Sequence, residues 1–145
     1  MTLVHASAVA LDGQAALIRG PSGSGKSDLA LRLLDAGWRL VADDQVALTV
    51  EAGVLRAAAH PRLAGRLEVR GIGIVRVPHL GEAPVVLVVD LVAPAEVERL
   101  PEAAAVTIEG VSLPSIRLAP FEVSAAAKLK FALRAAGGSA RAAAL

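Results

Sequence analysis

The chain has 145 residues, which is enough for one domain with a buried core and too few for two. Hydrophobic residues make up 54% of it, which excludes a disordered chain, and the absence of cysteine excludes a disulfide scaffold, a thiolate zinc site and a cysteine nucleophile. Fifteen basic residues against fourteen acidic ones leave a net charge of +1, which argues against a dedicated nucleic-acid binder.

Short runs rich in Val, Leu and Ala, separated by Gly and Pro, predict strands. In chain order these runs cover residues 3–11, 15–19, 39–50, 54–59, 68–77 and 85–92, with two more strands within 105–118. Apolar residues at helical spacing predict helices over 26–36 and 122–136, and Asp12-Gly13 predicts a tight turn. The pattern indicates an α/β fold, strand-rich with two main helices, without the regular βαβαβ order of a doubly wound sheet.

The mean hydropathy of +0.57 raises the question of a membrane segment. A membrane helix needs about 20 consecutive apolar residues. The most apolar stretch, residues 85–95, is interrupted by Asp90 and contains Pro94. No basic region precedes the first apolar residues, so no signal peptide is expected either. These features favour a cytoplasmic protein without a membrane partner.

One segment matches the phosphate-loop motif G-x-x-x-x-G-K-[ST] in full, between a predicted strand and a predicted helix. Its residues, all candidates for nucleotide binding, are Gly20, Pro21, Ser22, Gly23, Ser24, Gly25, Lys26 and Ser27. The glycines let the backbone curl with its N–H groups pointing inward, and the helix N-terminus favours an anion there. Lys26, expected to face solvent when no ligand is bound, would reach the outer phosphates, and the Ser27 hydroxyl could bind Mg²⁺.

The loop alone does not define the reaction, because it serves several classes of nucleotide-binding proteins. The guanine-binding sequence Asn-Lys-x-Asp of GTPases is absent. The alternatives that remain are a protein kinase, a kinase of a small metabolite, and a nucleotide-sensing protein without turnover.

Two carboxylates, Asp43 and Asp44, lie within a predicted strand. Adjacent residues of a regular strand face opposite ways, so only one of them would face the phosphate loop. That residue could be a Mg²⁺ ligand or a base that accepts a hydroxyl proton. The alternative is a turn marked by two solvated aspartates.

Glu68 and Arg70 are two residues apart in a β-prone segment that Gly71 and Gly73 interrupt. This spacing places both side chains on one face of a strand, where they could bind Mg²⁺ and neutralise phosphate. A surface ion pair is the alternative. His5 stands alone in an apolar strand, and such a residue is usually a core histidine whose hydrogen bonds are satisfied.

The order and spacing of His5, the loop 20–27, Asp43-Asp44 and the segment 67–74 resemble the catalytic domain of the HPr kinase/phosphorylase family. The resemblance implies an ATP-dependent kinase that phosphorylates a serine of HPr, the phosphocarrier of the bacterial phosphotransferase system, and a reverse phosphorolysis that releases pyrophosphate. It also implies Mg²⁺, a fold similar to phosphoenolpyruvate carboxykinase, and a homo-oligomer, often a hexamer. The residues it implies are His5, Lys26, Asp44 and Arg70 in catalysis, with Ser27, Glu68 and Asp43 at the metal.

The sequence also departs from that family. The long form carries an N-terminal domain that is not expected here, so residues 1–136 would form the catalytic domain and 137–145 a flexible tail. Ala119 stands where the family has an arginine before the last helix, and the loop used for phosphorolysis is not recognisable. Arg117, Lys128 or Lys130 could substitute, and the kinase direction is expected to be retained better than phosphorolysis.

Overall fold

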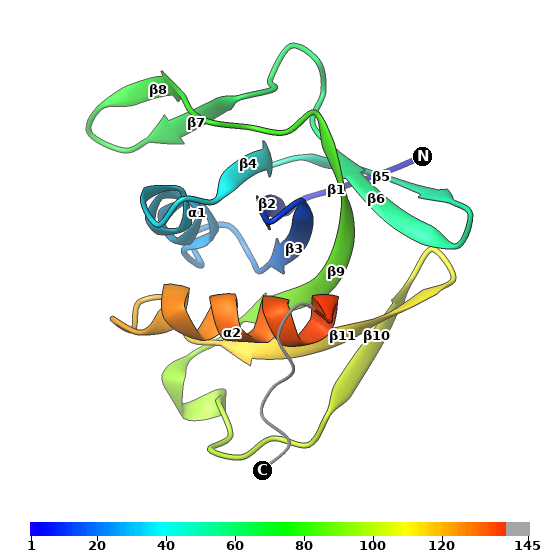
Figure 1. Ribbon diagram of the computed structural model, residues 1–145. Coiled ribbons are helices and arrows are strands. Elements are labelled where there is room, and N and C mark those ends of the chain that lie inside the picture. Colours follow the sequence, from blue (N-terminus) through cyan, green and yellow to red (C-terminus); the bar gives the residue numbers. More distant parts are fainter. Residues whose placement is uncertain (139–145) are drawn as a thin grey trace.

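The computed structural model describes residues 1–138, and Figure 1 shows its arrangement. In chain order the elements are β1 (Thr2–Val4), β2 (Ser7–Leu11), β3 (Gln14–Arg19), α1 (Lys26–Asp35), β4 (Arg39–Ala42), β5 (Val46–Glu51), β6 (Val54–Ala58), β7 (Arg66–Val69), β8 (Gly73–Arg76), β9 (Glu82–Leu91), the short 3₁₀ helix η1 (Pro94–Glu96), β10 (Ala104–Ile108), β11 (Val111–Leu118) and α2 (Ala125–Gly137). The expected α/β class, strand-rich with two main helices, is confirmed.

The main sheet has the strand order β1-β5-β6-β9-β3-β2-β4, with β11 also paired to β9 and β10 paired to β11. Strand β9 joins its parts, because its first residues pair antiparallel with β6 and its later residues lie parallel to β3 and β11. The carboxyl ends of β3 and β9 therefore meet at one edge of the sheet. The segment 20–25, which connects β3 to α1, starts at this edge, where open α/β sheets commonly bind ligands.

Two apolar clusters cover the two faces of the sheet. The first joins the helices to it, with Leu29 and Leu33 of α1 and Leu129 of α2 packed against β3 and β9. The second lies between the strands β2, β3 and β9 and the strands β5 and β6, and it includes Leu113 of β11. Figure 1 shows β5 and β6 on the right of β9. Since β3 is buried on both faces, its end holds the following loop in a fixed position.

The hairpin β7–β8 forms a separate two-stranded sheet beside α1. Leu67 and Val69 point into the first apolar cluster together with Trp38, whereas Arg66 and Glu68 are exposed. Because side chains alternate along a strand, one face of the hairpin packs on the first apolar cluster and the other faces away from it. The sequence predicted a single run over 68–77, but the structure has two strands, with Gly71 in the turn between them and Gly73 at the start of β8.

Two other predicted strands are also wrong as continuous elements. The run 3–11 breaks at a bend at His5, because β1 pairs with β5 whereas β2 pairs with β3 and β4. The run 39–50 breaks at Asp43-Asp44, because β4 belongs with β2 and β5 with β1 and β6. Both breaks lie where the chain passes from one part of the sheet to the other.

The predicted turn at Asp12-Gly13 is confirmed, with positive φ angles of 54° and 77° at the two residues. This is the backbone that a two-residue hairpin favours. Gly137 still belongs to α2 and Gly138 follows as its cap, while the rest of the predicted tail, 139–145, lies outside the described residues. Within residues 1–138, no helix is long and apolar enough to cross a membrane.

Candidate active site

The phosphate-loop segment curls from the end of β3 into the N-terminus of α1. The Ser24 N–H donates to the Pro21 carbonyl at 3.0 Å, and the Lys26 ammonium donates to the carbonyls of Gly20 at 2.6 Å and Pro21 at 3.1 Å. Lys26 is only 7% exposed, so the expectation that it faces solvent is wrong. Its buried ammonium takes both loop carbonyls as hydrogen-bond acceptors, because a buried charge needs such partners.

Phe121 stands against this loop from the segment before α2. A Cβ added to Gly25, whose φ is 101°, would lie 2.8 Å from the Phe121 ring. The ring nevertheless remains 70% exposed. A large exposed aromatic surface beside a phosphate loop offers a flat apolar contact to a bound molecule.

Asp43 faces the start of α1. Its carboxylate accepts hydrogen bonds from the hydroxyl of Ser27 at 3.1 Å and from the hydroxyl of Ser7, which is fully buried, at 2.9 Å. The Asp43 carboxylate is therefore held between two hydroxyl donors, Ser7 on β2 and Ser27 on α1. Two of the three groups implied at the metal, Ser27 and Asp43, are in direct contact.

The Asp44 side chain does not follow that of Asp43. The cause is a turn of the backbone, and not the strand alternation that the sequence suggested. The Gln45 N–H donates to the Asp43 carbonyl at 2.8 Å and closes a three-residue turn, with Asp44 at its centre at φ 67°. Such a backbone is rare and strained outside glycine and is enriched at functional positions, though Asp tolerates it better than most residues. The Asp44 carboxylate, 80% exposed, lies 3.3 Å from Nδ1 of His5.

His5 occupies the bend between β1 and β2. Its side chain is half exposed, and its Nε2 lies 3.5 Å from the Ser22 hydroxyl of the phosphate loop. The interpretation as a core histidine is therefore wrong. His5 instead lies between Asp44 and the loop.

One cleft of about 540 Å³ brings most of these groups together, whereas Asp43 lies behind Ser7 and Ser27 and is not among the lining residues. Its polar lining consists of His5, Ser7, Ser22, Lys26, Ser27, Asp28, Asp44, Glu68 and Arg70. Glu68 and Arg70 come from the hairpin β7–β8, and no ion pair joins them in the described part of the chain. The hairpin thus brings one carboxylate and one guanidinium to the phosphate loop.

The other candidate cations lie outside this cleft. Arg117 is exposed one residue before the end of β11, and Lys128 forms a 2.6 Å ion pair with Glu122. Lys130 is exposed on α2, and Ala119, at the position of the family's arginine, is buried. Among the described residues, Arg70 is the one arginine that lines the cleft.

Sequence reasoning missed three features of the site. Ser7 and Phe121 belong to no motif, and their neighbours are distant in sequence. The third is the pair of Arg19 and Asp90, joined by hydrogen bonds of 2.9 and 3.1 Å, which fastens the end of β3 to β9 directly before the loop. The sequence did hold one indication of this pair, because Asp90 is the charged residue within the apolar run of β9.

The fold and the cleft define an α/β domain whose cleft lies at a glycine-rich loop with the sequence of a phosphate-loop motif. A family model described as the HPr Serine kinase C-terminal domain matches residues 1–128. The chain therefore belongs to the HPr serine kinase C-terminal domain family.

Relatives and a solved structure agree with this assignment. The chain is 47% identical over 79 residues to an HPr kinase/phosphorylase of Clostridium novyi, and 37% identical over 95 residues to one of Mycoplasma mycoides. These matches cover 54% and 61% of this chain and 26% and 30% of the relatives, so the chain spans less than a third of their length. The structure of the Hpr(Ser) kinase/phosphatase from Coxiella burnetii superposes with a TM-score of 0.84 at 26% identity, covering 96% of this chain and 98% of that one.

Proposed function

We propose that this domain is an ATP-dependent protein-serine kinase that phosphorylates HPr. The observation that carries the proposal is the single cleft in which the phosphate loop, Asp44 and the hairpin residues Glu68 and Arg70 meet. A phosphate loop supplies a donor site, and an exposed carboxylate across the cleft supplies a base for an incoming hydroxyl. The names of the relatives, HPr kinase/phosphorylase, support HPr as the acceptor.

In this proposal each residue has a separate task. The loop amides, the N-terminus of α1 and Lys26 bind the phosphates of ATP, which requires the Lys26 ammonium to exchange loop carbonyls for phosphate oxygens. Asp44 accepts the proton of the serine hydroxyl as the serine oxygen attacks the terminal phosphorus in line, and ADP leaves with the bridging oxygen. His5 holds the Asp44 carboxylate through Nδ1 and is a positioning residue.

The residues present fit Mg²⁺. This ion prefers oxygen ligands and is usually bound by one or two carboxylates together with substrate phosphates. Ser27 and Asp43 offer a hydroxyl and a carboxylate in contact with each other, and Glu68 lines the same cleft. Bound there, the ion would neutralise charge on the transferred phosphoryl group.

Phosphorolysis, a homo-oligomer such as a hexamer and a cytoplasmic location remain predictions from the family resemblance. Two other activities fit a phosphate loop: phosphorylation of a small metabolite, and nucleotide binding without turnover. The absence of a nucleic-acid partner is likewise an expectation from the charge balance.

Transfer of labelled phosphate from ATP tests the proposal. Label is expected on HPr but not on an HPr whose acceptor serine is replaced by alanine. Lys26→Met, which keeps the buried stem and removes the ammonium, should lower the rate about a hundredfold or more. Label on a metabolite extract alone, nucleotide binding with no transfer, or near-normal transfer by a folded Lys26→Met protein would overturn it.

A further inference from the structure

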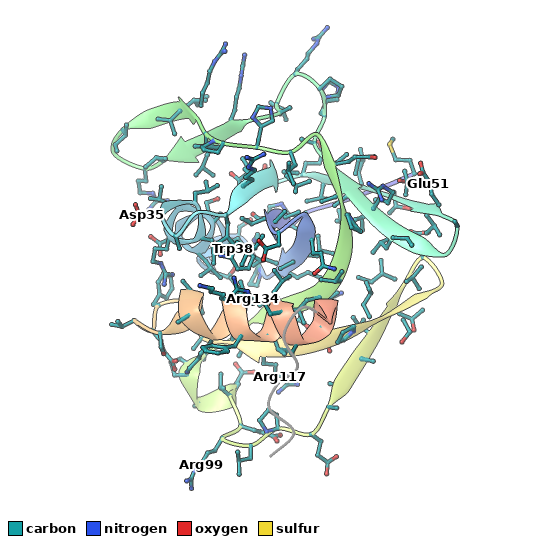
Figure 2. All side chains as sticks on the ribbon, viewed as in Figure 1. Asp35, Trp38, Glu51, Arg99, Arg117 and Arg134 are labelled. Atoms are coloured by element: carbon teal, nitrogen blue, oxygen red, sulfur yellow. The ribbon has the colours of Figure 1, made fainter. Side chains whose placement is uncertain are left out.

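A second hollow, of about 250 Å³, lies at the base of the hairpin β7–β8 and shares no lining residue with the cleft. The residues that line it are Pro61, Arg62, Ala64, Gly65, Arg66, Arg76, Val77 and His79. Three of them are arginines, and no carboxylate is among these described lining residues. Figure 2 shows long, nitrogen-tipped side chains projecting at this end of the molecule, far from the labelled Arg99.

The positive charges of the arginines around this hollow repel one another. The strand register places Arg66 directly opposite Arg76, and like charges at paired positions destabilise a hairpin. Within residues 1–138, no ion pair neutralises Arg62, Arg66 or Arg76. The described carboxylate partners belong to other arginines, namely Arg19, Arg32, Arg56 and Arg134. A bound anion would relieve this repulsion.

The wall of the hollow is held by specific backbone contacts. The Val77 N–H donates to the Gly65 carbonyl at 2.9 Å, which ties the segment before β7 to the end of β8. Gly65, at φ 73°, leaves room for the His79 ring, whose Nδ1 would lie 2.5 Å from a Cβ at that position. Nδ1 of His79 lies 3.2 Å from the Val77 carbonyl oxygen, which can only accept. With its hydrogen on Nδ1, the ring donates to this carbonyl and leaves Nε2 as an acceptor, which fits the hydroxyl of a hydrogen phosphate.

We propose that Arg62, Arg66, Arg76 and His79 form a binding site for a small phosphorylated anion. Guanidinium groups match phosphate oxygens in shape and charge, and they do so better than a lysine ammonium. The volume is below the roughly 300 Å³ at which pockets for larger ligands begin. It suits inorganic phosphate or the phosphate end of a small ester rather than a whole nucleotide. This site stands independently of the proposed kinase activity.

The three histidines of the chain allow a direct test by proton NMR. Their C2–H signals, assigned with His60→Gln and His79→Gln variants, are followed while inorganic phosphate is added at constant pH. Sodium chloride at matched ionic strength is the reference. A saturable shift of the His79 signal is expected, whereas phosphate in the cleft would move the His5 signal instead. Glycerol 3-phosphate is titrated in parallel. Tighter binding of inorganic phosphate indicates a site for free phosphate, and tighter binding of glycerol 3-phosphate indicates a site for phosphate esters.

Two variants decide whether the arginines form the site. Arg66→Gln/Arg76→Gln is expected to fold, because it removes like charges, and to need at least about tenfold more phosphate for the same His79 shift. Arg99→Gln, an exposed arginine elsewhere, should bind as the parent does. The proposal is overturned if the His79 shift is equal in chloride, does not saturate, or is unchanged in the double variant. A shift confined to His5 also overturns it while leaving the phosphate loop intact as a site.

Discussion

At the residue scale, the two neighbouring aspartates have acquired separate environments. Asp43 is fixed between the hydroxyls of Ser7 and Ser27, whereas Asp44 faces the open cleft beside His5. Their separation comes from the strained turn centred on Asp44 and not from strand alternation. A base must be accessible to its substrate, and of the two carboxylates Asp44 is the exposed one.

Substitution of each aspartate by asparagine should separate the two roles. Asp44→Asn keeps the shape but cannot accept a proton, so kcat should fall by about 10²–10⁴ with nucleotide affinity nearly unchanged. Asp43→Asn should instead weaken Mg²⁺-dependent nucleotide binding, because it alters the partner of Ser27. Steady-state kinetics with HPr and calorimetric titration with Mg²⁺ and ATP measure both. If Asp43→Asn abolishes turnover at normal nucleotide affinity while Asp44→Asn does not, the assignment is reversed.

Phe121 is predicted to provide a stacking surface for the adenine base. Phe121→Ala should weaken ATP binding about fivefold or more, since stacking on an aromatic ring contributes roughly 1–3 kcal/mol per base. Binding of tripolyphosphate, which has no base, should change little. Phe131→Ala is the matched control, because Phe131 is 78% exposed on α2 and lies outside the cleft lining. Equal losses for ATP and tripolyphosphate would show that Phe121 only supports the loop.

Contiguous parts of the site could be predicted from the sequence, and non-contiguous parts could not. The loop 20–27 is one uninterrupted motif, so its place and chemistry follow directly. Ser7 contacts Asp43 and Phe121 contacts the loop across long stretches of chain, and no local pattern encodes such contacts. Burial of Lys26 was also missed, because it depends on carbonyl groups that only the folded loop presents.

At the element scale, periodicity located both helices and most strands but not the two breaks in the predicted strands. Alternation and apolarity are similar on both sides of His5 and of Asp43-Asp44, although the chain changes strand partners there. The chain can change its strand partners without a change in amino-acid composition, so only the hydrogen-bonded pairing of the strands reveals the break. Two of the candidate site residues, His5 and Asp44, lie at these breaks.

Helix α2 is predicted to hold the Phe121 segment in place through its buried face. Leu129 is fully buried between α2 and the sheet. Leu129→Ala should lower the free energy of unfolding by about 2–5 kcal/mol, whereas Phe131→Ala, on the exposed face, should change it by less than about 0.5 kcal/mol. Trp38, the one tryptophan and 2% exposed, reports unfolding in urea by its fluorescence. Equal effects of the two substitutions would contradict the packing of α2.

At the scale of the whole molecule, the cleft is lined by few cations. Lys26 and Arg70 are the described lysine and arginine in its lining, and Lys26 is already bonded to the loop carbonyls. Arg19 is bound to Asp90, Lys128 to Glu122, and Arg117 is exposed near the end of β11. Phosphate transfer from ATP needs charge neutralisation mainly at the donor, which the loop supplies.

Phosphorolysis makes a further demand, because inorganic phosphate must be held beside phosphoserine-HPr as a second anion. With Arg70 as the one arginine lining the described cleft, we expect the forward kinase reaction to exceed phosphorolysis by at least about tenfold. Pyrophosphate release from phosphoserine-HPr, Mg²⁺ and phosphate measures the reverse rate, and ATP with unmodified HPr the forward one. Arg70→Gln should lower phosphorolysis more than the kinase reaction, while Lys130→Gln, outside the cleft, should lower neither. Equal rates in both directions would mean that a cation outside this lining reaches the second phosphate.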